Sequence, residues 1–256
     1  RFMKLLALDT STEQLSIAVG RDDGGHPRVW THDGPGGAMA SATLIPSVLA
    51  LLEQACLGLP ELDAIAFGAG PGSFTGLRTA CAVAQGLGYG AGVPLLPVDT
   101  LLAVAEDARH LRAPDGAPVR VMAVLDARMD EVYAARYAWD GARWSAGGDW
   151  VVCKPEALAA GEPADGAGWV VAGNAFGAFG DRLLPGWPRQ EARPTAGALL
   201  RLAPALLATG QAVPAAQALP RYIRDKVART TEERERDKAA ALPTPPTDSP
   251  AGTPPR

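Results

Sequence analysis

The chain opens with three apolar segments that are separated by polar turns. Residues 3–8 are almost continuously apolar, as in a strand buried on both faces, and residues 15–19 alternate apolar with small or polar side chains. The Asp-Asp-Gly-Gly sequence at 22–25 is a strong turn signal, after which residues 28–32 can return as a third strand. The pattern therefore predicts a three-stranded meander.

Helical periodicity follows the meander. Residues 41–56 place leucine, isoleucine and valine at helical spacing, and residues 62–67 form the next apolar strand. A glycine-rich loop at 68–76 leads into a helix to about residue 87 and then into a strand at 93–98. We therefore expect two helices that alternate with two further strands.

The same order of elements begins again near the middle of the chain. Residues 119–125 form an apolar strand, and Leu125-Asp126 at its end matches Leu8-Asp9 at the end of the first strand. In each copy the next apolar strand position follows the aspartate by six residues, at Leu15 and at Val132. The repeat predicts an α/β protein of two duplicated strand–strand–strand–helix–strand–helix domains that face each other across a cleft.

The second copy is less regular than the first. Its expected elements are a turn at 140–141, a third strand that ends near Trp150, a short helix at 155–160, a strand at 169–172, and helices at 175–184 and 195–209. We divide the chain into a first domain at 1–110 that is completed by about 192–224, a second, degenerate domain at 111–191, and a tail at 225–256. The tail is charged and then proline-rich, which predicts disorder.

Composition narrows the class of protein. The 256 residues are 47% hydrophobic and 20% charged, and their formal net charge is −4. A chain that grips nucleic-acid phosphates by itself usually has a basic excess, so we expect a partner to supply most of the grip on any RNA. Three widely spaced cysteines favour a reducing cytoplasm over a disulfide framework. We expect neither a signal peptide nor a membrane span.

Two aspartates are the first candidates for chemistry. Asp9 and Asp126 each end the first strand of one copy, so their carboxylates can hold a hydrated magnesium ion beside nucleotide phosphates in the cleft. Thr10, which follows Asp9, is a candidate for the same nucleotide or anion site. Each aspartate can instead cap a turn through its own backbone amides, which is the commoner role of an isolated aspartate.

The glycine-rich loop is a second candidate, for nucleotide or anion binding. Glycines such as Gly72 bring backbone amides close to an anion, Ser73 or Thr75 is a natural N-cap of the helix that follows, and Arg78 adds positive charge. The loop lacks the Gly-Lys-Ser/Thr ending of a Walker A motif. A structural strand-to-helix turn explains the same glycines equally well.

The two helices of the first copy carry more apolar residues than a single buried face needs. Such helices are covered on more than one side, either by a second layer of their own domain or by another protein. Our candidates for a partner interface are Leu44, Val48, Leu51, Leu52, Leu77, Ala80, Cys81 and Ala84. Because apolar helices avoid exposure to water, we also predict a homodimer when the chain is alone.

Signals for catalysis are weak. The three histidines, His26, His32 and His110, form neither an HxxxH nor an HExxH arrangement, and Ser73 lacks the Gly-x-Ser-x-Gly context of a nucleophile elbow. We therefore assign no catalytic residue and no metal ligand.

Five motifs together are specific. They are Leu6-Ala-Leu-Asp-Thr-Ser-Thr12, Gly68-Ala-Gly-Pro-Gly-Ser-Phe-Thr-Gly-Leu-Arg78, Ala84-Gln-Gly-Leu87, Leu125-Asp-Ala-Arg-Met-Asp-Glu-Val-Tyr133 and Pro220-Arg-Tyr-Ile-Arg224. With these motifs the chain resembles the TsaB (YeaZ) family over about residues 3–228. The resemblance implies an actin-like ATPase (ASKHA) fold of duplicated ribonuclease-H-like βββαβα domains, which agrees with the internal repeat.

The resemblance also implies a function. Members of this family are non-catalytic dimerisation partners of the transferase TsaD, which makes N6-threonylcarbamoyladenosine at position 37 of tRNA, and the ATPase TsaE joins the complex. The first two helices, here 41–56 and 75–87, would contact TsaD. Many relatives carry His-Ser or His-Thr at the start of the first helix, where this chain has Ala40-Ser41. This departure weakens any expectation of metal chemistry there.

The alternative is an ATP-handling enzyme with an actin-like fold, because fold alone does not decide activity. It would use Asp9 and the Gly70–Arg78 loop to bind ATP or ADP with magnesium. The partner-subunit interpretation requires no cofactor, and tRNA would be reached through the complex.

Overall fold

The computed structural model describes residues 3–22, 26–160 and 166–222. Both predicted copies lie within one compact unit. The predicted tail at 225–256 lies outside the described residues. None of the helices in the described part of the chain combines the length and hydrophobicity needed to cross a membrane.

The first sheet confirms the predicted meander. Its strands are β1 (Lys4–Asp9), β2 (Gln14–Asp22), β3 (Pro27–Pro35), β4 (Ala64–Gly70) and β5 (Leu95–Asp99), in the order β3-β2-β1-β4-β5. β1, β2 and β3 pair antiparallel, whereas β4 pairs parallel with β1 and with β5. The two parallel connections run through α1 (Ala40–Gln54) and α2 (Phe74–Ala91).

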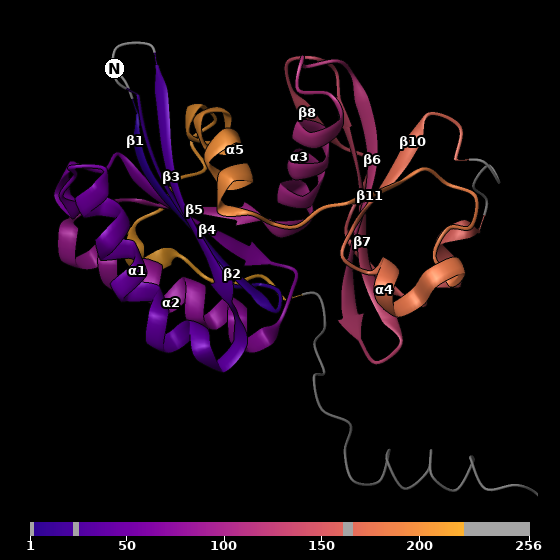
Figure 1. Cartoon of the computed structure of the whole chain (residues 1–256), viewed down its shortest axis with the longest axis horizontal. Coiled ribbons are helices and arrows are strands. Elements are labelled where there is room, and N and C mark those ends of the chain that lie inside the picture. Colours follow the sequence, from indigo (N-terminus) through magenta and orange to yellow (C-terminus); the bar gives the residue numbers. More distant parts are fainter. Residues whose placement is uncertain (1–2, 23–25, 161–165, 223–256) are drawn as a thin grey trace, which may run out of the picture. The chain divides into compact units, whose positions relative to one another are not determined.

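The second sheet repeats this topology. Its strands are β6 (Val119–Arg128), β7 (Glu131–Trp139), β8 (Trp144–Ala146), β9 (Val151–Cys153), β10 (Trp169–Gly173) and β11 (Arg189–Glu191). The order β8-β7-β6-β10-β11 matches the order β3-β2-β1-β4-β5 of the first sheet (Figure 1). β9 also pairs with β7. The predicted duplication of a ribonuclease-H-like domain, and with it the actin-like fold, is confirmed.

Two details of the second copy differ from the prediction. The third strand is split into β8 and β9, which pair with opposite ends of β7. The helix expected at 175–184 shrinks to α4 (Phe176–Phe179) and a 3-10 turn at Gly180–Arg182. Gly180 has a φ of 51°, which ends the helix after one turn. Further 3-10 turns are Gly37–Met39, Leu59–Glu61, Pro155–Ala159 and Ala215–Gln217.

Two helices link the sheets. α5 (Ala196–Ala208) packs against β1, β2 and β4 of the first sheet, whereas α3 (Thr100–Arg112) packs mainly against β6, β10 and β7 of the second. α3 also contacts α5 and the strands β4 and β5 of the first sheet, so α3 packs between the two copies (Figure 1). The apolar face of α3, including Leu101 and Val104, lies in the core of the second copy, although α3 falls within the first domain predicted from sequence.

The candidate interface residues lie in the core of the first copy. None of Leu44, Val48, Leu51, Leu52, Leu77, Ala80, Cys81 and Ala84 is more than 4% exposed. Seven of them belong to the cluster that packs α1 and α2 against the first sheet; Leu77 is buried as well. These residues therefore cannot form a docking surface, because a partner would reach them only after the domain had opened. The apolar periodicity therefore identified the side of each helix that packs against the chain's own first sheet, not a side that faces a partner.

Candidate functional site

A cavity of about 640 Å³ opens beside the end of β1. Asp9 and Asp33 come from the first copy and Asp107 from α3. Glu191 ends β11, and Arg193 lies between β11 and α5. Four acidic residues and one arginine thus line the cavity, so its wall has more acidic than basic residues.

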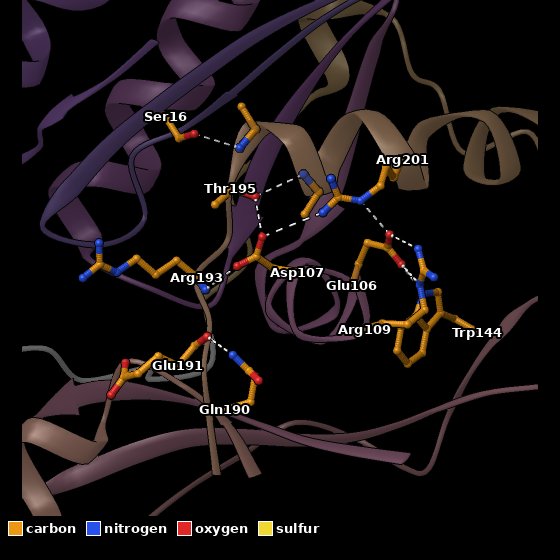
Figure 2. Close-up of polar contacts among 12 residues, drawn as sticks. Ser16, Glu106, Asp107, Arg109, Trp144, Gln190, Glu191, Arg193, Thr195 and Arg201 are labelled. Atoms are coloured by element: carbon orange, nitrogen blue, oxygen red, sulfur yellow. Dashed lines mark hydrogen bonds and ion pairs between the residues drawn. The ribbon is translucent and has the colours of Figure 1, made fainter. Parts of the chain in front are cut away.

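Hydrogen bonds fix the wall of this cavity at the start of α5. The Thr195 hydroxyl caps α5 by accepting from the Ala198 amide at 3.2 Å, and it donates to Asp107 Oδ1 at 3.0 Å (Figure 2). Asp107 Oδ2 accepts from the Arg193 amide at 3.1 Å, and Ser16 Oγ accepts from the Ala196 amide at 2.9 Å. α3, α5 and β2 are therefore joined at one point.

Two carboxylates of the β5–α3 segment, the buried Glu106 and the partly buried Asp99, join the copies. Glu106 is 3% exposed, and it accepts hydrogen bonds from Arg109, from Arg201 of α5 and from the indole of Trp144 in the second sheet (Figure 2). Burial opposes the ionisation of Glu106, but the bonds from Arg109, Trp144 and Arg201 outweigh it, so its pKa lies below the ordinary value.

Asp99, at the start of α3, also accepts hydrogen bonds from side chains of the second copy. Its Oδ1 accepts from the Leu101 amide at 2.9 Å and so caps the helix, while its Oδ2 accepts from the Tyr137 hydroxyl and from the Trp150 indole. Burial raises the pKa of Asp99. Asp99 and Glu106 therefore hold three aromatic side chains of the second copy against α3.

Asp9 caps the turn that follows β1. Its Oδ1 accepts from the Ser11 amide at 2.9 Å and from the Ser11 hydroxyl at 2.7 Å, whereas Oδ2 is buried and has no hydrogen-bond partner among the described residues. Oδ2 lies so close to Gly68 that a Cβ at that position would come within 1.7 Å of it. Burial raises the pKa of Asp9 to about 7. Asp9 thus has the capping role that the sequence left open.

Asp126 caps the corresponding turn of the second copy. Its Oδ1 accepts from the Arg128 amide at 2.7 Å, its Oδ2 lies 3.2 Å from the Arg128 guanidinium, and its own amide donates to Asn174. Asp126 is not among the residues that line the cavity at Asp9. The structure therefore does not place both aspartates in the wall of that cavity.

The glycine-rich loop packs against the turn after β1. A Cβ at Gly72 would come within 2.6 Å of the Ser11 carbonyl, and one at Gly76 within 1.8 Å of the Thr10 carbonyl. The Ser73 amide donates to the Ser11 carbonyl at 2.7 Å, and the Thr10 hydroxyl donates to the Gly76 carbonyl at 2.6 Å. These contacts explain the glycines by close backbone approach, which supports the structural interpretation of the loop.

The remaining loop candidates serve α2 or lie on its surface. The Ser73 hydroxyl accepts from the Gly76 amide at 3.4 Å, so Ser73 is the N-cap of α2. Thr75 and Arg78 are exposed, and Arg78 donates to the hydroxyl of Tyr222 at 3.0 Å. Arg193 is the one basic residue among those that line the cavity, against four acidic residues, so a phosphate without a metal ion would meet an excess of acidic groups there. The described residues contain no group of three or more His, Cys, Asp or Glu that could hold a metal ion.

Sequence reasoning missed most of the polar network. Glu106 and Arg201 lie 95 residues apart and Asp107 and Thr195 lie 88 apart, and neither pair belongs to a recurring motif. A capping Thr before an apolar helix was the one available signal, and it marks the start of α5 at Thr195.

The repeated strand order of the two sheets defines a protein with an actin-like fold. The family model described as "TsaD: tRNA N6-adenosine threonylcarbamoyltransferase" matches residues 39–179. The tRNA threonylcarbamoyladenosine biosynthesis protein TsaB of Escherichia coli is 34% identical over 234 residues, which cover 88% of this chain and 96% of that protein. TsaB of Haemophilus influenzae is 34% identical over 242 residues, covering 88% and 95%.

Solved structures agree with these relatives. YeaZ from Pseudomonas aeruginosa is 38% identical, with a TM-score of 0.74 over 86% of this chain and 100% of that one. The chain therefore belongs to the TsaB (YeaZ) family, as its motifs indicated.

Proposed function

We propose that the chain is a non-catalytic partner subunit in the biosynthesis of threonylcarbamoyladenosine in tRNA, and that it binds and activates a TsaD-like transferase. The names of its relatives and its family model support the pathway. The partner role is supported by the side of α1 and α2 that faces away from the core.

The exposed side of α1 and α2 is the observation that carries this proposal. Ile45 and Leu49 are 44% and 50% exposed and lie one turn apart on α1. On the neighbouring α2, Ala82 and Gly86 are exposed, and a Cβ at Gly86 would meet nothing within 4 Å. Apolar side chains beside small residues allow another helix to approach closely. This docking face, defined by Ile45, Leu49, Ala82 and Gly86, replaces the buried residues that the sequence suggested.

The test is association with the TsaD-like protein of the same organism, measured by light scattering after gel filtration. Leu49→Glu and Ile45→Glu should abolish the heteromer, because each places a charge at the centre of the docking face. Leu111→Glu is the matched control, since Leu111 is 57% exposed at the far end of α3. Wild-type association in both docking-face variants would exclude this face.

We make three further proposals. The chain forms a homodimer through the docking face when the transferase is absent. A TsaE-like ATPase joins the assembled complex, and tRNA is bound through that complex in the cytoplasm. Light scattering of the chain alone gives the first test: Leu49→Glu should convert a dimer into a monomer, and a wild-type monomer at high concentration would contradict it.

We also propose that the chain works without its own nucleotide. The acidic lining of the cavity beside Asp9 would require a magnesium ion to bind a triphosphate, and the described residues form no group of three or more His, Cys, Asp or Glu that could hold one. The alternative, an ATP-binding enzyme that uses Asp9 and the Gly70–Arg78 loop, predicts micromolar magnesium-ATP binding that Asp9→Asn weakens. Calorimetry on the purified chain separates the two, and saturable binding that depends on Asp9 would favour the alternative.

A further inference from the structure

The last described residues fold back across α2 to the glycine-rich loop. Val213 pairs with Leu95 through two backbone hydrogen bonds of 2.8 and 2.9 Å, and the Ala218 carbonyl accepts from the Gln85 side chain at 2.9 Å. The Arg221 amide then donates to the Ala69 carbonyl at 2.6 Å. Main-chain contacts therefore hold this segment in place independently of the side chain of Tyr222.

Tyr222 completes an aromatic and cationic group at the start of α2. Its ring centroid lies 5.1 Å from that of Phe74, and the two planes are tilted by 37°. The Arg78 guanidinium lies 3.8 Å from the Phe74 centroid and 5.9 Å from the Tyr222 centroid. We call Phe74, Arg78 and Tyr222 the stacking platform.

The platform is open to solvent. Phe74 is 37% and Tyr222 is 43% exposed, so neither ring is consumed by its contact with the other. Arg78 and Arg221 are exposed, and within the described part of the chain neither has a carboxylate partner. Among the described residues, two guanidinium groups without a carboxylate partner thus accompany two half-exposed rings, in a chain whose formal net charge is −4.

This combination suits unpaired nucleic-acid bases. Each base offers a π face that stacks on aromatic rings and guanidinium planes, while arginine also contacts the neighbouring phosphate. A duplex keeps its bases stacked internally and offers mainly phosphates and ribose, which an acidic protein attracts poorly. The platform therefore favours single-stranded RNA over a duplex.

We propose that the stacking platform of Phe74, Arg78 and Tyr222 binds unpaired bases of the RNA on which the complex acts, so that this subunit contacts the RNA directly. The inference rests on the proposed function, which supplies RNA as the substrate class. It also refines the expectation from net charge, because stacking adds affinity that phosphate contacts alone would not provide.

The test is fluorescence anisotropy of the full chain with a labelled RNA hairpin that has a single-stranded loop, at low ionic strength. We expect saturable binding with a Kd of about 1–100 µM, the range of weak electrostatic complexes. Phe74→Leu and Tyr222→Leu should each weaken binding about tenfold, because each removes one stacking surface. Tyr222→Phe keeps the ring and should retain the wild-type affinity.

Two controls match the platform by residue type. Tyr89→Leu removes an 81% exposed ring at the other end of α2, and Arg143→Gln removes an exposed guanidinium from the β7–β8 turn. Neither should change RNA affinity, whereas Arg78→Gln should reduce the slope of log K against log salt by about 0.7. Thermal melts establish that each variant is folded.

Three results would overturn the inference. The first is a lack of saturable hairpin binding, and the second is equal competition by a fully paired duplex. The third is that platform variants keep their RNA affinity but no longer bind the transferase, which would assign the platform to the protein interface. Transferase association is measured in parallel. A chain that keeps the transferase but does not bind RNA contradicts only this inference, and one that binds RNA but not the transferase contradicts the proposed function.

Discussion

The two copies share a strand order but differ in the helices that cover their sheets. The first sheet carries α1 and α2, with 15 and 18 residues. The corresponding connections of the second sheet hold a five-residue 3-10 turn at Pro155–Ala159 and the four-residue α4. The sheet topology therefore persists without long helices, whereas a broad helical docking face requires them. This difference explains why we place partner binding in the first copy.

The second copy closes its core by other means. Leu183, Leu184 and Trp187 come from irregular segments and are buried against the outer face of its sheet. On the inner face, Trp144 and Trp150 reach the carboxylates Glu106 and Asp99. The second copy thus serves as a scaffold that is tied to the first copy by buried polar contacts.

The substitution with the largest expected effect on stability, Ala84→Glu, tests whether the two copies unfold as one unit. Ala84→Glu buries a carboxylate in the core of the first copy, and it should cost more than about 4 kcal/mol of unfolding free energy. Five of the six tryptophans lie in the second copy. If the copies are coupled, tryptophan fluorescence and far-ultraviolet circular dichroism should shift together in urea. Two separate transitions would show that the copies are independent.

The next effect concerns the contacts that tie the copies together. Glu106→Gln removes the charge that Arg109 and Arg201 share, so we expect a loss of about 2–4 kcal/mol in urea unfolding. Glu156→Gln is the matched control in the second copy, where Glu156 pairs with Arg182 at the surface. Its unfolding midpoint should not move, and equal effects of the two substitutions would show that burial does not matter here.

The sequence predicted the sheets better than it predicted the surfaces. The repeated apolar strand with Leu-Asp, at the end of β1 and near the end of β6, identified the duplication, because buried strands have a strong apolar signature. The same apolar signature could not tell which side of α2 is buried in the core and which side is exposed. Ala80 and Ala84 are buried while Ala82 is exposed, and a small residue has little preference between core and surface.

The candidate site was predictable only in part. The sequence located Asp9 and the glycine-rich loop, but it could not choose between a phosphate site and a structural turn. That choice depends on close approach of the Gly72 and Gly76 backbone to the turn after β1, which no local pattern reveals. Asp107 and Arg193, which complete the cavity, come together only through the packing of α3 against α5.

A smaller effect on the free energy of unfolding is expected at Asp9, whose counterpart in the second copy is Asp126. Burial raises the pKa of Asp9 to about 7 from 3.8, so the folded state binds a proton that the unfolded state has released between these pH values. Stability should therefore fall as the pH rises from about 4 to about 7 and stay level above that. Asp9→Asn removes this cost.

The measurement is a pair of urea titrations, one near pH 5 and one near pH 8. Asp9→Asn should be no more stable than the wild type at the lower pH and more stable by about 1–3 kcal/mol at the higher pH, allowing for an unpaired amide beside Gly68. Asp126→Asn is the comparison variant at the matching position of the second copy, where the carboxylate is partly exposed and pairs with Arg128. A pH-independent effect at Asp9 would mean that its carboxylate is ionised in the folded protein.

The smallest expected effect on stability belongs to the docking face. Leu49 and Leu52 lie three residues apart on α1, but Leu49 is 50% exposed and Leu52 is 3% exposed. Leucine and glutamate have similar helix propensities, so the two Leu→Glu substitutions differ mainly in burial. Leu49→Glu should stay within about 0.5 kcal/mol of the wild type in urea, whereas Leu52→Glu should cost more than about 4 kcal/mol. A stable Leu49→Glu chain that no longer binds the transferase would separate folding from recognition on one helix, and a destabilised one would show that both sides of α1 support the fold.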